Sequence, residues 1–180
     1  MSGISKSSPA ARSAMHRKVA QRQEWFVPKQ ERQALLAREF RGWHAGENLP
    51  HFDAPNTHQF ITLRLADTLP RPALDLARSQ TSDLAQVHWI DQQLDAGSGA
   101  CWLHRPAVAE LTQEAILWFQ GSRYDVLAWV IMPNHFHCLI KIGTDFPMAK
   151  IVRTWKSITA HRINRILDRK GAVWQTEVWD

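Results

Sequence analysis

The sequence predicts an α+β domain in which helices pack against an antiparallel sheet. Residues 124–132 and 135–142 are rich in β-branched and apolar side chains and are separated only by Pro133-Asn134, which predicts a β-hairpin. Residues 58–65 have the composition of a further strand, and segments with helical periodicity lie before and after the hairpin. This order of strands and helices is typical of a sandwich with an antiparallel sheet.

The helices are predicted from apolar residues that recur at helical spacing. Residues 74–94 and 106–119 are expected to form two helices, and Pro106 is tolerated in a first turn. Residues 147–167 predict a longer helix with an apolar face and basic remaining faces, followed by a short last strand at 172–175. The apolar positions of the long helix are Met148, Ile151, Trp155, Ile158, Ile163 and Ile166.

The N-terminal part of the chain has less regular patterning. Residues 1–40 predict a basic, partly flexible arm, although residues 28–41 have helical composition. The Gly, Pro and Asn residues of segment 42–55 predict a loop. The folded domain is therefore expected to span residues 41–180.

Composition limits the class of protein further. A chain of 180 residues with 44% apolar residues can form one domain with a buried core. No apolar run approaches the roughly 20 residues of a membrane span, and the basic start does not resemble a signal peptide, so a soluble cytoplasmic protein is expected. Cys101 and Cys138 lack the spacing of a cysteine zinc site, and both are expected to be reduced.

The net charge of +5 is distributed unevenly along the chain. Residues 1–45 carry nine Lys and Arg against three Glu, residues 46–145 carry six against eleven acidic residues, and residues 146–180 carry seven against three. The basic ends are expected to attract a polyanion such as DNA, although a solvated helix face is the simpler alternative. The candidate DNA-binding residues at the C-terminal end are Lys150, Arg153, Lys156, Arg162, Arg165, Arg169 and Lys170.

The candidate functional site is the pair His135 and His137 in the predicted hairpin. Side chains two residues apart in a strand lie on the same face, so the two imidazoles can share one divalent cation. The alternative is that His135 is a turn residue and His137 a hydrogen-bonded core residue. Two ligands alone leave the metal-binding hypothesis open.

Residues 124–142, with the sequence YDVLAWVIMPNHFHCLIKI, resemble the Met-Pro-Asn-His-x-His strand of REP-associated tyrosine transposases, members of the HUH superfamily. The resemblance continues through Trp155-Lys156-Ser157 and Val173-Trp174-Gln175, and extends back over residues 41–70. It implies a ferredoxin-like sandwich, with the histidines on a central strand, that acts as a homodimer on single-stranded or hairpin repeat DNA. It also implies that His135 and His137, with a third polar ligand, hold Mg²⁺ or Mn²⁺.

The sequence departs from this family at the nucleophile. The family's tyrosine is expected at position 178, where this chain has Val178, and the family's C-terminal segment is missing, which favours a truncated copy. The only tyrosine is Tyr124. A regular hairpin register places Tyr124 opposite Gly143 on the histidine face, about 20 Å along the strand from the metal site. It is therefore expected to pack as an ordinary strand residue.

Three functions remain open. The first is a transposase-family protein with impaired strand cleavage, the second a non-catalytic DNA-binding module on the same scaffold, and the third an unrelated metal-dependent hydrolase. Trp43 and Trp102, in predicted loops, are candidates for stacking on unpaired bases. Trp89, Trp118 and Trp155 are expected in the core.

Overall fold

A computed structural model of the chain describes residues 39–45, 50–69, 76, 79 and 82–176. The predicted arm at residues 1–40 and the helical segment at 28–41 therefore lie almost entirely outside the described residues and remain predictions. No helix in the described part is long and apolar enough to cross a membrane.

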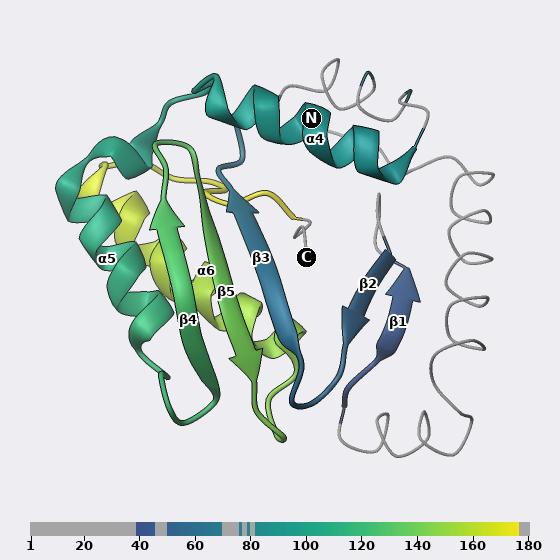
Figure 1. The fold of residues 1–180 in the computed structure, drawn as a ribbon. Coiled ribbons are helices and arrows are strands. Elements are labelled where there is room, and N and C mark those ends of the chain that lie inside the picture. The colour runs from purple at the N-terminus through teal and green to yellow at the C-terminus, as the bar shows by residue number, and fades with distance from the viewer. Residues whose placement is uncertain (1–38, 46–49, 70–75, 77–78, 80–81, 177–180) are drawn as a thin grey trace.

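The centre of the fold is a three-stranded antiparallel sheet in the order β3 (His58–Arg64), β5 (His135–Ile142) and β4 (Tyr124–Ile131) (Figure 1). The predicted strand and hairpin are thus confirmed, and the histidine-bearing strand is the central one. Every strand pair of this sheet is antiparallel, as the order of elements predicted. The α+β fold class is confirmed.

The last part of the chain extends this sheet beyond β3. Leu65 forms an antiparallel bridge with Trp174, and the Gln175 N–H donates to the carbonyl of Arg64 at 2.9 Å. The strand predicted at 172–175 is thus reduced to a single bridge. Counting this segment as a fourth strand, the order is last segment, β3, β5, β4, which is the strand order of a ferredoxin-like fold.

Two helices, α5 (Pro106–Leu117) and α6 (Met148–Ile166), cover one face of the sheet and contact each other (Figure 1). Pro106 occupies the first turn of α5, as predicted. The core between these helices and the sheet includes Phe136, Ile140 and Trp155, each at most 2% exposed. A short 3-10 helix, η1 (Trp102–His104), precedes α5.

The remaining helix, α4 (Asp83–Asp95), lies across one end of the sheet (Figure 1). The hydroxyl of Ser82 accepts a hydrogen bond from the Ala85 N–H at 3.1 Å and caps its first turn. The helix predicted at 74–94 is confirmed for the residues from Asp83 onward. Residues 70–75, 77–78 and 80–81 are not described.

The prediction of a loop at 42–55 was wrong. This segment contains a two-stranded antiparallel sheet of β1 (Gly42–Ala45) and β2 (Pro50–Asp53), in which Trp43 packs against Phe52 with ring centroids 5.0 Å apart. Cross-strand aromatic pairs stabilise such hairpins. The turn-forming composition suggested a loop because the strands are only four residues long.

Two hydrogen bonds attach this hairpin to the rest of the domain. The Asp53 carboxylate accepts from the Met148 N–H at 3.0 Å and so caps the first turn of α6. The Gln59 side chain donates to the carbonyl of Phe52 at 3.0 Å and joins β3 to β2. The hairpin is thereby held beside the β3 edge of the main sheet.

The predicted position of Tyr124 was also wrong, because β4 contains a β-bulge. The register shifts between Val126 and Ala128, so Tyr124 pairs with Ile142 rather than with Gly143. One extra residue in a strand moves the following side chains to the other face. Tyr124 therefore lies on the helix-covered face, where it packs in the core as expected.

Not every apolar residue at helical spacing is buried. Trp155 is in the core, as predicted, but Trp118 is 72% exposed because α5 ends at Leu117 and Trp118 is the C-cap residue. Ile158 and Ile166 are also exposed, since the buried face of α6 is narrower than the apolar pattern suggested.

Removing the Tyr124 hydroxyl is expected to destabilise the domain. This hydroxyl donates to the Ile116 carbonyl at 2.8 Å and accepts from the Trp155 indole N–H at 2.8 Å. Tyr124→Phe leaves both buried partners unsatisfied, so the free energy of unfolding should fall by about 1–3 kcal/mol in urea titrations. The control, Trp118→Phe on the exposed surface, should change it by less than about 0.5 kcal/mol. Equal effects of the two variants would contradict the buried hydrogen bonds.

Candidate functional site

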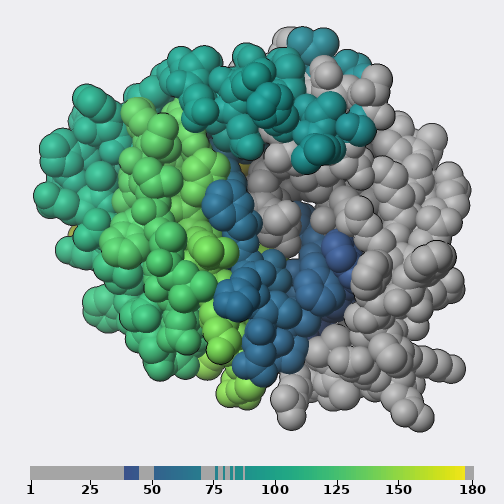
Figure 2. Space-filling model, in the orientation of Figure 1, coloured from purple at the N-terminus to yellow at the C-terminus, as the bar shows by residue number. Residues whose placement is uncertain are grey.

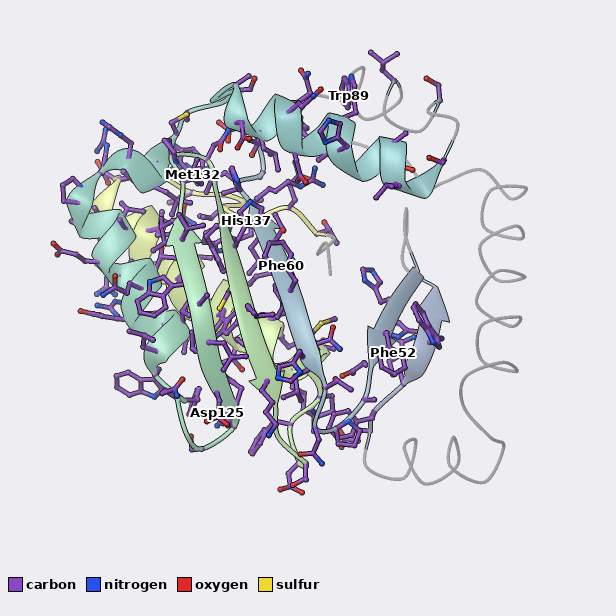
Figure 3. All side chains as sticks on the ribbon, in the orientation of Figure 1. Phe52, Phe60, Trp89, Asp125, Met132 and His137 are labelled. Atoms are coloured by element: carbon purple, nitrogen blue, oxygen red, sulfur yellow. The ribbon has the colours of Figure 1, made fainter. Side chains whose placement is uncertain are left out.

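The two histidines of β5 lie together on the sheet face opposite α5 and α6. Their Nε2 atoms are 3.1 Å apart and their ring centroids 4.7 Å apart, so the prediction that they share a face is confirmed. Phe136 and Cys138, between and after them, point into the buried core. Figure 3 shows His137 on the side of the sheet from which Phe60 also projects.

The geometry of this pair fits a divalent cation. Two imidazole nitrogens at about 2.1 Å from one ion are separated by about 3.4 Å in tetrahedral coordination and by about 3.0 Å at adjacent octahedral positions. The Nε2 atoms of His135 and His137, 3.1 Å apart, fall within this range. Imidazole is also a common ligand of divalent transition metals. The pair could therefore supply two adjacent ligands.

Asn134 determines which nitrogen of His135 carries the proton. Its side-chain amide donates to the carbonyls of Leu94 and Ser98, both at 3.0 Å, so its Oδ1 must face the His135 Nδ1 at 2.7 Å. Because Oδ1 can only accept, the Nδ1 of His135 donates. In the neutral ring, Nε2 then keeps its lone pair, which is the protonation state that a metal ligand needs.

Thr62 can orient His137 in either of its neutral tautomers. Its hydroxyl lies 2.8 Å from the Nδ1 of His137, and a hydroxyl can donate or accept. Without a cation, the Nε2–H of His137 donates to the Nε2 of His135, and Thr62 donates to Nδ1. If Nε2 instead binds a cation, Nδ1 carries the proton and donates a hydrogen bond to the hydroxyl oxygen of Thr62. Both ligands thus have an orienting partner.

Burial keeps both imidazoles neutral. It lowers the pKa of His135 from 6.5 to about 4, and the neighbouring His137 contributes in the same direction. Burial also lowers the pKa of His137, against the charges of Asp91 and Asp95, which raise it. At neutral pH both rings are therefore available as ligands without first losing a proton.

Charged residues from two other elements surround the pair. Arg64, at the end of β3, is 2% exposed and lies opposite His135 in the register of β3 and β5. Asp91 and Asp95, one turn apart on α4, are close enough for their charges to act on His137. Within the described residues, no group of three His, Cys, Asp or Glu side chains is arranged to hold a metal ion. A third protein ligand is therefore not formed by these residues.

The histidine face also presents apolar side chains to solvent. Phe60 stacks on the His137 ring with centroids 5.2 Å apart and an interplanar angle of 20°, and it is 54% exposed. Leu127 and Val130 of β4 are exposed as well. Figure 2 shows the strands open to solvent on this face next to α4. An exposed aromatic ring stacked on an imidazole is suited to contact an unpaired base.

The basic residues predicted to bind DNA lie elsewhere. They belong to α6 and the segment after it, in the helical layer behind the sheet (Figure 1). The sequence does not indicate which side of the sheet a helix covers, and in the fold these residues are not brought together with the histidines. Any DNA that contacts both regions must pass around an edge of the sheet.

Several of these basic side chains have structural partners. Lys150 pairs with Glu39, and Arg162 pairs with Glu114 at 3.2 Å. Lys156 donates to the carbonyls of Gln175 and Thr176. The basic side chains that are exposed to solvent and lie outside these contacts are Arg153, Arg165 and Lys170.

The two tryptophans predicted to stack on bases are already engaged. Trp43 packs against Phe52 in the β1–β2 hairpin. Trp102 lies under the guanidinium of Arg169, which is 4.0 Å from its ring centroid and also donates to Asn164 and Ala172. Phe60, which the sequence pattern did not single out, is the aromatic side chain that stacks on His137.

Three further contributors to the site were not identified from the sequence. Thr62 and Arg64 follow Phe60 at intervals of two in a predicted strand, so the alternation places all three on one face once the pairing with β5 is known. Asn134 was assigned only to the turn. Its hydrogen bonds to the end of α4 depend on tertiary structure and leave no signal in the local sequence.

The site combines a central-strand His-x-His pair with a ferredoxin-like strand order in an α+β domain. Residues 104–180 match the family model described as "Transposase IS200 like". This match includes both histidines and α6, and it confirms the predicted relationship to tyrosine transposases over that part of the chain. Position 178 lies outside the described residues.

Among solved structures, the chain is similar to one described as "Structure of the REP associates tyrosine transposase bound to a REP hairpin". The two are 18% identical with a TM-score of 0.42, and the similarity covers 72% of this chain and 57% of that one. The chain therefore spans little more than half the length of that transposase. No curated protein matches the chain significantly.

Two substitutions of Asn134 should separate its roles in metal binding and stability. Asn134→Leu removes the acceptor for His135 Nδ1, so the affinity for Mn²⁺ should fall about 10–100-fold in calorimetry. Asn134→Asp keeps that acceptor but places oxygen against the Leu94 and Ser98 carbonyls. It should bind Mn²⁺ within a few-fold of the unaltered protein while unfolding at lower urea. His137→Ala should abolish binding, and unchanged affinity in Asn134→Leu would contradict the tautomer argument.

Acid should destabilise the metal-free protein between pH 6.5 and about 4. The unfolded chain protonates its histidines near 6.5, whereas the folded pKa of His135 is about 4, so protons bind the unfolded state more readily. Stability is complete above 6.5 and decreases as the pH falls, by at most about 3 kcal/mol for this residue. Urea unfolding in the presence of a chelator measures the slope.

A matched pair of variants tests the origin of this pH dependence. His135→Gln should reduce the slope between pH 6.5 and 4, whereas His161→Gln, on the exposed side of α6, should leave it unchanged. The same slope in His135→Gln and the unaltered chain would assign the acid sensitivity to other groups.

Proposed function

We propose that this protein binds single-stranded or hairpin repeat DNA as a transposase-family protein whose metal-assisted strand cleavage and joining is impaired. The observation that carries the proposal is the convergent Nε2 pair of His135 and His137, within the segment that matches the IS200-like family model. We further propose that it acts as a homodimer in the cytoplasm.

The side chains on the histidine face can perform the parts of this function that do not need a nucleophile. His135 and His137 would hold Mg²⁺ or Mn²⁺, and Asn134 and Thr62 orient their rings. When bound, such a cation neutralises charge on a phosphate and polarises it for attack. Arg64 adds a buried positive charge beside His135, which favours the approach of a phosphate group.

The missing step is nucleophilic attack. The Tyr124 hydroxyl lies on the helix-covered face, is engaged in two hydrogen bonds, and has its pKa raised by burial. It therefore cannot reach a phosphate bound at the histidines. With Val178 at the expected position of the family's tyrosine, no tyrosine of this chain is placed to form a covalent link to DNA.

This arrangement also favours a second function, a non-catalytic DNA-binding module derived from the same scaffold. The two functions differ in whether any strand cleavage occurs. The third alternative, an unrelated metal-dependent hydrolase, receives no support from the family match, which includes the histidine pair.

DNA binding should be dominated by contacts to phosphates. The affinity for a hairpin oligonucleotide should fall steeply with salt, and replacing Arg153, Arg165 and Lys170 with Gln should reduce the slope of log K against log salt by up to about 3. Fluorescence anisotropy over a salt series measures this slope. Lys156 is left unchanged because it donates to backbone carbonyls. An unchanged slope in the triple variant would exclude these side chains as contacts.

The same oligonucleotide distinguishes the two functions on a denaturing gel. The 180-residue chain should form no covalent adduct with DNA in Mn²⁺. Val178→Tyr alone should restore little, because attack requires close alignment with the phosphate. Adding the tyrosine together with a family-like C-terminal segment should restore nicking if the scaffold is an impaired transposase. No nicking by that extended variant, with DNA binding intact, would favour the non-catalytic module. An adduct with the unaltered chain would show that another residue attacks.

A further inference from the structure

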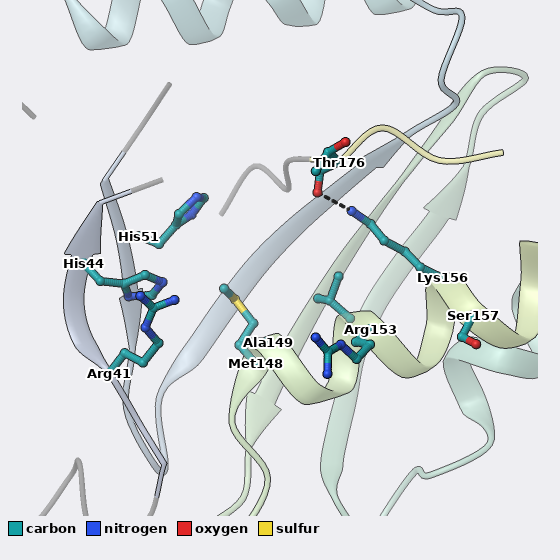
Figure 4. A pocket seen from close by; sticks show the side chains of 10 residues that line it. Arg41, His44, His51, Met148, Ala149, Arg153, Lys156, Ser157 and Thr176 are labelled. Carbon is teal, nitrogen blue, oxygen red and sulfur yellow. Dashed lines mark hydrogen bonds between the residues drawn. The ribbon is translucent and has the colours of Figure 1, made fainter. Parts of the chain in front are cut away.

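A second candidate site lies between the β1–β2 hairpin and α6, beside the β3 edge of the sheet. It is an open pocket with a volume of about 680 Å³. This volume lies within the range of small-molecule and cofactor sites, about 300–1,000 Å³. Figure 4 shows Arg41 and His51 on one side of the pocket and Arg153 and Lys156 on the other.

The charged lining of the pocket is entirely basic. Arg41 precedes β1, and Arg153 and Lys156 lie one turn apart on α6. None of the described residues that line the pocket is acidic. Lys156 also holds the carbonyls of Gln175 and Thr176, so the two arginines are the side chains best placed to receive an anion. Three positive charges, one before β1 and two on α6, favour a phosphate group.

The rest of the lining suits a flat ring rather than a simple ion. His44 and His51 pair directly across β1 and β2, with ring centroids 5.5 Å apart and an interplanar angle of 37°. The His44 Nδ1 is 3.0 Å from the carbonyl of Gly42, which fixes its ring. Met148 and Val152 provide an apolar floor on α6. An inorganic anion would leave these imidazole and apolar surfaces without contact.

We propose that this pocket binds one unpaired nucleotide of a single-stranded nucleic acid. Arg41 and Arg153 contact the phosphate, and the base packs against the imidazoles of His44 and His51 over the apolar floor. Stacking on flat side chains combined with phosphate contacts is a general mode of single-strand binding. This inference rests on the proposed binding of DNA and adds a second contact region, separate from the metal-binding face.

The position of the pocket gives it a geometric role. The pocket is lined by α6, whereas His135 and His137 lie on the opposite face of the sheet. A strand with one nucleotide in the pocket can pass around the β3 edge toward Phe60 and His137. The pocket would therefore hold a single-stranded tail, while the exposed basic residues further along α6 contact a duplex stem.

The test compares two hairpin oligonucleotides, one blunt and one with a three-nucleotide single-stranded tail, by fluorescence anisotropy. The unaltered protein should bind the tailed hairpin at least tenfold more tightly. The pocket variant, Arg41→Gln with Arg153→Gln, should lose this preference. The control variant, Arg165→Gln with Lys170→Gln, removes the same charge outside the pocket and should weaken both hairpins equally. Equal weakening of both hairpins by the pocket variant would indicate long-range charge effects and overturn the proposal.

A second measurement does not depend on binding to hairpin DNA. Titration with dAMP should shift the imidazole NMR signals of His44 and His51 in the unaltered protein, but not in the pocket variant. Inorganic phosphate at the same concentration should cause smaller shifts, and equal shifts with phosphate would reduce the pocket to an anion site and contradict the proposal. If the protein binds neither hairpin but dAMP shifts both histidines, the DNA-binding function fails while the nucleotide site stands. If dAMP causes no shift, the nucleotide site fails.

Discussion

The side chain of Asn134 connects the candidate metal site to the architecture of the domain. Its amide group donates to the carbonyls of Leu94, in α4, and of Ser98, just after this helix, and its oxygen accepts a hydrogen bond from the Nδ1–H of His135. A residue that is 1% exposed can make three hydrogen bonds only if all of its partners are fixed, since an unsatisfied buried amide is costly. The position of α4 and the protonation state of His135 therefore depend on each other.

The two faces of strand β5 carry side chains with different roles. Its even-numbered side chains from Phe136 to Ile142 form part of the core, whereas His135 and His137 face the other side. This alternation allows the histidine face of the sheet to remain open while α5 and α6 cover the opposite face. As a consequence, the basic side chains of α6 and the two histidines lie on opposite sides of the sheet. A nucleic-acid strand that contacted both surfaces would have to pass around the edge of the sheet.

Much of this arrangement could be predicted from the sequence because it depends on local periodicity. The β4–β5 hairpin, the shared face of His135 and His137, and the helices α5 and α6 all follow from spacings of two or of three to four residues. The β1–β2 hairpin could not be predicted, because its strands are short and its attachment to α6 depends on Asp53 contacting the distant backbone of Met148. The bulge in β4 likewise has no local signature. It lets Tyr124 reach hydrogen-bonding partners on α5 and α6.

The hydrogen bond from Met148 to Asp53 also has a consequence for the order of folding. It joins residues separated by 95 positions, whereas β4 and β5 are joined by a turn of three residues between their ends. Closing a long loop is slower and entropically less favourable than closing a short one. The β4–β5 hairpin is thus suited to form early, and the β1–β2 hairpin to dock after the sheet and α6 have assembled. A bond formed after the rate-limiting step affects the lifetime of the folded state more than the speed of reaching it. The contact at Asp53 would then act mainly to slow the opening of the domain.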